Sequence, residues 1–249
     1  GWTSRIVGVR DWTAWIGQGV HAGLALLPDK PSITLGKFTF GTYYEEALKQ
    51  GRLFPPSLYK PEGLAQVERC LEYALEHPLL PEGFQVTGTE VNLGTYASIL
   101  DVAGTLKGKP TFIDWKIKLK LKPDYYDQEL EKYRYDWKEA RHYPWALSQH
   151  MGQRVEEYTV VIFVLEPFKV LQRTYKVNWK VVERWAKGCQ NEYVTGVWQQ
   201  MFVTGAQQSN HCHPGAYGFP CEYLDACWNY DLDREMMKNG GFIQIERRK

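Results

Sequence analysis

Apolar and polar residues alternate along residues 111–122, which read TFIDWKIKLKLK. Such alternation is typical of a strand with one buried face, because successive side chains point to opposite sides of a sheet. One set consists of Ile113, Trp115, Ile117, Leu119 and Leu121, and the other of Asp114, Lys116, Lys118, Lys120 and Lys122. The pattern predicts a strand over 110–121, with one acid at the head of a row of lysines.

Other patterns predict helices before, between and after the strands. Helices are expected over 41–50 and 62–77, and strands over 83–91, 95–106, 158–165 and 170–177. Residues 123–153 are expected to be helical in at least two pieces, broken at Pro144, and a further helix from about 178 to 203 begins with Asn178 as N-cap. This order predicts an α/β or α+β fold, a central mixed sheet flanked by helices.

The chain has 249 residues, 44% of them hydrophobic, which suffices for one domain with a substantial core. We divide this single domain into an unassigned N-terminal segment (1–40), a core (41–205) and a cysteine-containing tail (206–249). The odd number of cysteines does not suit a disulfide framework and indicates a reducing compartment inside the cell: the cytoplasm of a bacterial or virus-infected host, or the mitochondrial matrix. The first residue is Gly1 instead of Met, as in a piece of a longer polypeptide.

No apolar run approaches the ~20 residues of a membrane span, so we expect no membrane association. The formal net charge of +1 argues against a polycation that coats nucleic acid, and confines any nucleic-acid site to a local basic patch. The lysine row is the candidate patch. The alternative is a solvated strand face with Asp114 in a surface ion pair.

Lys107 and Gly108 form a candidate two-residue hairpin turn. Such a turn pairs the two strands so that Asp101 lies opposite Asp114, with Cβ atoms ~5 Å apart. Like charges at that distance require an opposite charge, which a divalent cation or the nearby Lys116 supplies. A turn one residue longer would shift the register and separate the two acids. Two acids suit Mg²⁺ or Mn²⁺, which activates water and polarises a phosphoryl oxygen.

These residues resemble the core of the PD-(D/E)xK nuclease superfamily, in its RecB-type branch. The run YASILDVAGTLKGKPTFIDWKIK is similar to the corresponding run in mitochondrial genome maintenance exonucleases and related phage nucleases, and GTYYEEAL resembles the family's GTxxHExL helix. The resemblance implies a restriction-endonuclease-like fold in which Asp101 and Asp114 bind the metal, together with the main-chain carbonyl of Trp115. It also implies that Lys116 is catalytic and that Glu90 assists.

The sequence departs from the family pattern at two motifs. Glu45 stands where the family has a metal-binding histidine, and would offer an oxygen ligand that favours hard cations. The family's Q-x-x-x-Y helix, which contacts the DNA backbone, maps onto WALSQHMG, where Gln149 and His150 are the nearest equivalents. With Lys118 from the lysine row, these two form the expected nucleic-acid-binding set.

The tail resembles the C-terminal part of an iron-sulfur site found in some RecB-type nucleases, through Cys212, Cys221 and Cys227. The fourth cysteine, which the family carries ahead of its histidine helix, has no counterpart here. A zinc site that also uses His211 and His213 is the alternative, and the reading without a metal is favoured. Cys70 and Cys189 fall in expected helices, where a thiol is usually buried.

The expected function is a Mg²⁺- or Mn²⁺-dependent deoxyribonuclease that acts on single strands or DNA ends as an exonuclease. A structure-specific or restriction-like endonuclease is the first alternative, and a catalytically inactive nucleic-acid-binding module is the second. The expected partner is DNA, with a helicase or polymerase as a partner or fused domain.

Overall fold

The computed structural model describes residues 7–55, 58–93, 99–135 and 139–195. These residues divide into two compact units. The first comprises residues up to Glu131 together with His142–Val177, and the second comprises Lys132–Arg141 and the chain from Asn178 onwards. The candidate site lies in the first unit.

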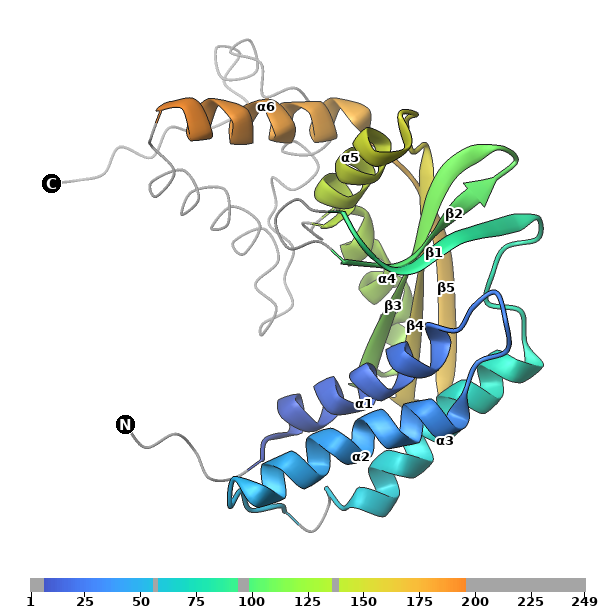
Figure 1. Cartoon of the computed structure of the whole chain (residues 1–249), viewed down its shortest axis with the longest axis vertical. Helices are drawn as coiled ribbons and strands as arrows, with labels where there is room; N and C mark the ends of the chain where they lie inside the picture. The colour runs from blue at the N-terminus through green and yellow to red at the C-terminus, as the bar shows by residue number, and fades with distance from the viewer. Residues whose placement is uncertain (1–6, 56–57, 94–98, 136–138, 196–249) are drawn as a thin grey trace, which may run out of the picture. The chain divides into compact units, whose positions relative to one another are not determined.

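The first unit is built on a mixed five-stranded sheet in the order β1-β2-β3-β4-β5 (Figure 1). The strands are β1 (Phe84–Asn92), β2 (Ile99–Leu106), β3 (Lys109–Lys120), β4 (Glu157–Glu166) and β5 (Lys169–Lys176). Strands β3 and β4 are parallel and the other neighbours are antiparallel. A parallel pair requires a long connection, and here it contains the 3₁₀ helix η1 (Pro123–Tyr125), α4 (Tyr126–Tyr135) and α5 (Glu139–Met151). The predicted α+β fold is confirmed.

Helices α1 (Val9–Leu24), α2 (Ile33–Lys49) and α3 (Lys60–Glu76) pack against one face of the sheet (Figure 1). Ile113 and Trp115 of β3 belong to the core on this face. The other face of β3 meets the connection between β3 and β4, since the Phe112 ring contacts the Tyr143 ring of α5. Both faces of β3 are therefore covered at this level, whereas the side chains of Lys118 and Lys120 further along the strand are 39% and 72% exposed.

The hairpin between β2 and β3 has the predicted two-residue turn. Leu106 pairs with Lys109, and both turn residues have positive φ, 53° at Lys107 and 75° at Gly108, as in a type I′ turn. The pairing runs on in the predicted register to Val102 opposite Ile113, the residue before Asp114.

Three features differ from the sequence-based expectations. Helix α1 lies in the segment that received no assignment, and α2 also begins there, at Ile33 instead of residue 41. Pro144 lies inside α5 and does not break it, because the helix is retained by buried neighbours such as Ala146 and Leu147, which outweigh the loss of one helical hydrogen bond. The last helix of the described residues, α6 (Trp179–Thr195), follows Asn178 as predicted, and the Val181 N–H approaches Asn178 Oδ1 at 3.4 Å. The remainder of the predicted helix, to about residue 203, lies outside the described residues.

None of the helices in the described part of the chain is long and apolar enough to cross a membrane.

Candidate functional site

Three acids occupy neighbouring positions on three adjacent strands: Glu90 on β1, Asp101 on β2 and Asp114 on β3. The pairs Thr89–Val102 and Val91–Leu100 flank the step from Glu90 to Asp101, and the pair Val102–Ile113 precedes the step from Asp101 to Asp114. The hairpin register and the β1–β2 register together create this row.

Strand β2 stops pairing with β3 at the level of the row. Beyond Val102, the Trp115 N–H donates a hydrogen bond to Asp101 Oδ2 at 2.6 Å. The carboxylate of Asp101 thus replaces a strand partner at the edge of β3. One Asp101 oxygen is fixed by the backbone, which leaves Oδ1 for another group.

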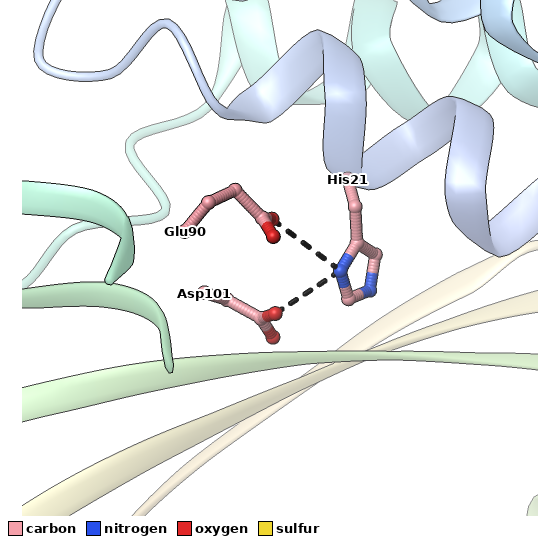
Figure 2. Close-up of side chains that lie close together, drawn as sticks. All are labelled: His21, Glu90 and Asp101. Atoms are coloured by element: carbon pink, nitrogen blue, oxygen red, sulfur yellow. Dashed lines mark ion pairs between the residues drawn. The ribbon is translucent and has the colours of Figure 1, made fainter. Parts of the chain in front are cut away.

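That other group is His21 on α1 (Figure 2). His21 Nδ1 lies 3.1 Å from Asp101 Oδ1 and 4.0 Å from Glu90 Oε1. The ligand atoms of His21, Glu90 and Asp101 all lie within 4.8 Å of one another. We call these three residues the His-Glu-Asp cluster.

Helix α1 brings His21 to the sheet through a buried apolar stripe, Trp12, Ile16, Val20 and Leu24. Gly19 permits a close crossing with α2, since a Cβ at this position would lie 2.8 Å from the carbonyl oxygen of Gly36. His21 follows Val20 at the edge of the stripe, and its side chain is 25% exposed. The helix packing therefore fixes the imidazole over the acid row, with part of it open to solvent.

Glu90 has an unusual backbone, with φ +49° within β1. Non-glycine residues rarely adopt this left-handed conformation, and such positions concentrate at functional sites. Burial and the charge of Asp101 raise the pKa of the Glu90 carboxyl, although His21 partly offsets them. The fold thus holds the Glu90 carboxyl group in surroundings that disfavour its ionised form.

Two opposing influences act on the His21 imidazole. Burial disfavours its charged form, but the hydrogen bond and charge of Asp101, with smaller contributions from Asp114 and Glu90, outweigh burial and raise the pKa of His21. The acid row therefore favours the protonated form of His21, whose charge offsets part of the negative charge of the row when no other cation is bound.

Asp114 is the most deeply buried acid of the row, with 2% of the residue exposed. Its Oδ2 forms an ion pair with Lys116 Nζ at 2.7 Å. Among the described residues, no donor approaches this oxygen with the geometry of a hydrogen bond. Burial, together with the charge of Asp101, raises the pKa of Asp114 to about 7, against the opposing influence of Lys116. An additional positive charge near Asp114 would therefore favour its ionised form.

The donor set fits a divalent cation. Imidazole nitrogen and carboxylate oxygen together suit Mn²⁺, and the carboxylates also suit Mg²⁺. The raised pKa values of Glu90 and Asp114 come from burial and from the charge of Asp101 between them, both of which a bound cation offsets. The cluster is accordingly a candidate metal site, with Asp114 beside it.

The structure does not bring Glu45 to this cluster. Glu45 lies on α2 and its carboxylate pairs with Lys60 at the start of α3. The neighbouring Tyr44 and Ala47 are buried, so Glu45 faces outward, with its side chain 51% exposed. The helical histidine at the acid row is instead His21, which the sequence did not identify.

The expected nucleic-acid-binding residues come from two different elements, with Lys118 on β3 and the adjacent Gln149 and His150 on α5. Lys118 Nζ lies 2.8 Å from the buried carboxylate of Glu129. Gln149 and His150 are exposed at the end of α5. Lys116 and Lys120 are also paired, with Asp114 and Glu166, so the lysine row is largely neutralised by acids. Its role in DNA binding stays a prediction.

The cysteine tail, with Cys212, Cys221, Cys227 and both histidines of the zinc alternative, lies outside the described residues. Cys70 is buried in α3, and burial raises the pKa of its thiol to about 12, which is characteristic of an inert core cysteine. Cys189 lies in α6.

Comparison with protein-family models finds no match to this chain, and a search of curated proteins also finds no related sequence.

Glu90→Asn is expected to raise the free energy of unfolding of the metal-free protein by about 1 kcal/mol, because asparagine adopts a positive φ more readily than glutamate. Chemical denaturation in EDTA measures the change. Glu90→Gln removes the same charge without favouring positive φ, so the difference between the two variants isolates the backbone contribution. Equal stability of the two variants would contradict backbone strain at Glu90.

Proposed function

We propose that this chain is a metal-dependent deoxyribonuclease that hydrolyses phosphodiester bonds in single-stranded DNA or at DNA ends. One observation carries the proposal: the His-Glu-Asp cluster lies near the middle of β3, close to the buried Asp114 and its partner Lys116. The resemblance of this hairpin to RecB-type nucleases supports the same activity.

The cluster would hold Mn²⁺ or Mg²⁺ through His21, Glu90 and Asp101, with Asp114 as the neighbouring acid. When bound, such a cation polarises a phosphoryl oxygen and lowers the pKa of coordinated water. The other catalytic roles would be performed by side chains of the protein.

Lys116 is suited to stabilise negative charge that develops on a phosphate. Its side chain is 30% exposed, and its ammonium group pairs with the carboxylate of Asp114, whose side chain is 3% exposed. A positive charge held in this way acts on a transition state without reorganisation. Asp101 connects His21 with strand β3, because its Oδ1 faces His21 and its Oδ2 accepts a hydrogen bond from the Trp115 N–H.

The pairing of the lysine row favours local contact with DNA over a long basic track. Three lysines of β3 each have an acid partner, so the strand does not supply a continuous unopposed charge for duplex binding. This arrangement is compatible with single strands or ends as the substrate, and with a helicase or polymerase that delivers them.

Replacing Lys116 by alanine is expected to reduce DNA cleavage about 100-fold, because a preorganised positive charge is removed from the reacting phosphate. The measurement is cleavage of 5′- and 3′-labelled single-stranded DNA in Mn²⁺, Mg²⁺ or EDTA. Lys120→Ala is the matched control: it lies on the same face of β3, pairs with Glu166 and is 72% exposed. It should cleave like the parent protein.

The same assay separates the alternatives. Cleavage of circular single strands would indicate an endonuclease, and its restriction to linear substrates would indicate an exonuclease. DNA binding without turnover in either metal would contradict the proposal and favour an inactive nucleic-acid-binding module. Equal cleavage by the parent protein and Lys116→Ala would remove Lys116 from the mechanism.

A further inference from the structure

Glu90 and His21 belong to elements far apart in the sequence, yet their side chains must meet for the cluster to form. Strand β1 lies at the edge of the sheet and pairs only with β2 among the described strands. The β1–β2 pairing also has a register shift between Val86 and Gly88, just before Glu90. Pairing with β2 alone therefore leaves the position of Glu90 relative to α1 undetermined.

One side-chain hydrogen bond joins β1 to α1 at this point. Thr89 Oγ1 donates to the carbonyl oxygen of Ala25 at 2.6 Å. The N–H of Ala25, the C-cap of α1, donates to the carbonyl oxygen of His21 at 2.8 Å. Two consecutive hydrogen bonds thus connect the backbone of His21 with the residue that precedes Glu90.

The left-handed backbone of Glu90 makes this connection effective. In a regular strand Thr89 and Glu90 would point to opposite faces of the sheet, so only one of them could approach α1. With φ +49° at Glu90, the alternation is interrupted, and both side chains engage α1: Thr89 through Ala25, and Glu90 towards His21 (Figure 2).

We infer that Thr89 is a positioning residue that holds Glu90 against His21 and so sets the geometry of the metal site. This inference rests on the proposed function, because it concerns the same His-Glu-Asp cluster. Thr89 itself offers no ligand to the cluster, since its hydroxyl is bonded to Ala25. Residues that orient metal ligands in this way typically change metal affinity 10- to 100-fold when replaced.

The test is Mn²⁺ binding by isothermal titration calorimetry, with thermal unfolding in EDTA measured alongside. Thr89→Val keeps the shape of the side chain and removes the hydroxyl, and it is expected to raise the Kd for Mn²⁺ about tenfold. Thr89→Ser retains the hydroxyl and is expected to restore the affinity of the parent protein. If Thr89→Val does not fold, Thr89→Ala provides the same comparison.

A matched control separates positioning from general stability. Thr111 Oγ1 donates to the carbonyl oxygen of Glu157 at 2.7 Å, a similar partly buried bond between β3 and β4. Thr111→Val should lower the unfolding temperature about as much as Thr89→Val, without changing the affinity for Mn²⁺. His21→Ala supplies the reference for loss of a direct ligand.

The outcomes distinguish two kinds of failure. If the parent protein binds Mn²⁺ more tightly than His21→Ala, but Thr89→Val binds like the parent or Thr89→Ser binds as weakly as Thr89→Val, the positioning role is overturned and the metal site stands. If the parent protein and His21→Ala bind Mn²⁺ equally, or neither binds it, the metal site is overturned and the role of Thr89 with it.

Discussion

Asp114→Asn is expected to reduce DNA cleavage by about 10³-fold or more and, at the same time, to stabilise the metal-free protein. The loss of activity follows from removal of a negative charge beside the proposed metal site, where several kcal/mol of transition-state stabilisation would depend on the metal and the surrounding carboxylates. Cleavage of labelled single-stranded DNA in Mn²⁺ measures this effect.

The gain in stability has a separate cause. The Asp114 carboxyl is buried, and its raised pKa means that the fold disfavours its ionised form. An amide of the same shape avoids this cost, so the free energy of unfolding in EDTA at pH 8 should rise by about 1–3 kcal/mol. Asp124→Asn, which alters an exposed acid of η1, should change neither cleavage nor stability.

The role proposed for Asp114 requires that Asp114→Asn lowers the rate of cleavage and raises the free energy of unfolding. A variant that loses both activity and stability would mean that the charge of Asp114 holds the fold together through Lys116. A variant that remains active would mean that Asp114 does not take part in the reaction. Either result would contradict the role proposed for this residue.

The proximity of Asp101 and Asp114 was predictable because it depends on local rules. The alternation along residues 111–122 fixes which side chains share a face, and the Lys107-Gly108 turn fixes the register. Both signals lie within one hairpin, so no distant contact was needed to place the two acids. The structure confirms the turn and the register up to the residue before Asp114.

His21 was not predictable in the same way. Its helix has a recognisable spacing of four between Trp12, Ile16 and Val20, which would have indicated an apolar stripe. Three glycines, at 17, 19 and 23, obscured that signal, because glycine lowers helix propensity. The glycines favour close helix packing instead, and the contact of His21 with Asp101 spans 80 positions of the chain, a separation that no local pattern encodes.

The surroundings of the lysine row were not predictable for a related reason. Alternation shows that Lys116, Lys118 and Lys120 share a face, but not what covers that face. The buried Glu129 that meets Lys118 comes from α4, in the connection after β3. Whether a row of lysines can bind a partner thus depends on acids that other elements place beside it. The positions of those acids follow from the tertiary fold and not from the local sequence pattern.

Raising the pH from 5 to 8 is expected to destabilise the metal-free protein. The folded state raises the pKa of Asp114, Glu90 and His21 above their ordinary values. Each group therefore keeps its proton in the folded state at a pH where the unfolded chain has released it, and stability falls as pH rises through that interval. For Asp114 the interval runs from its ordinary value of 3.8 to about 7, and its contribution is on the order of 2–4 kcal/mol.

Thermal unfolding in EDTA across this pH range measures the decline. Saturating Mn²⁺ should reduce or reverse it, because the cation binds the deprotonated ligands and so stabilises the folded state most at high pH. Since other groups titrate over the same range, the informative quantity is the difference between the parent protein and Asp114→Asn, which should grow as pH rises towards 7 and then level off. A difference that shrinks with rising pH would show that Lys116 stabilises ionised Asp114 more than burial penalises it, and the acid row would then need no bound cation to balance its charge.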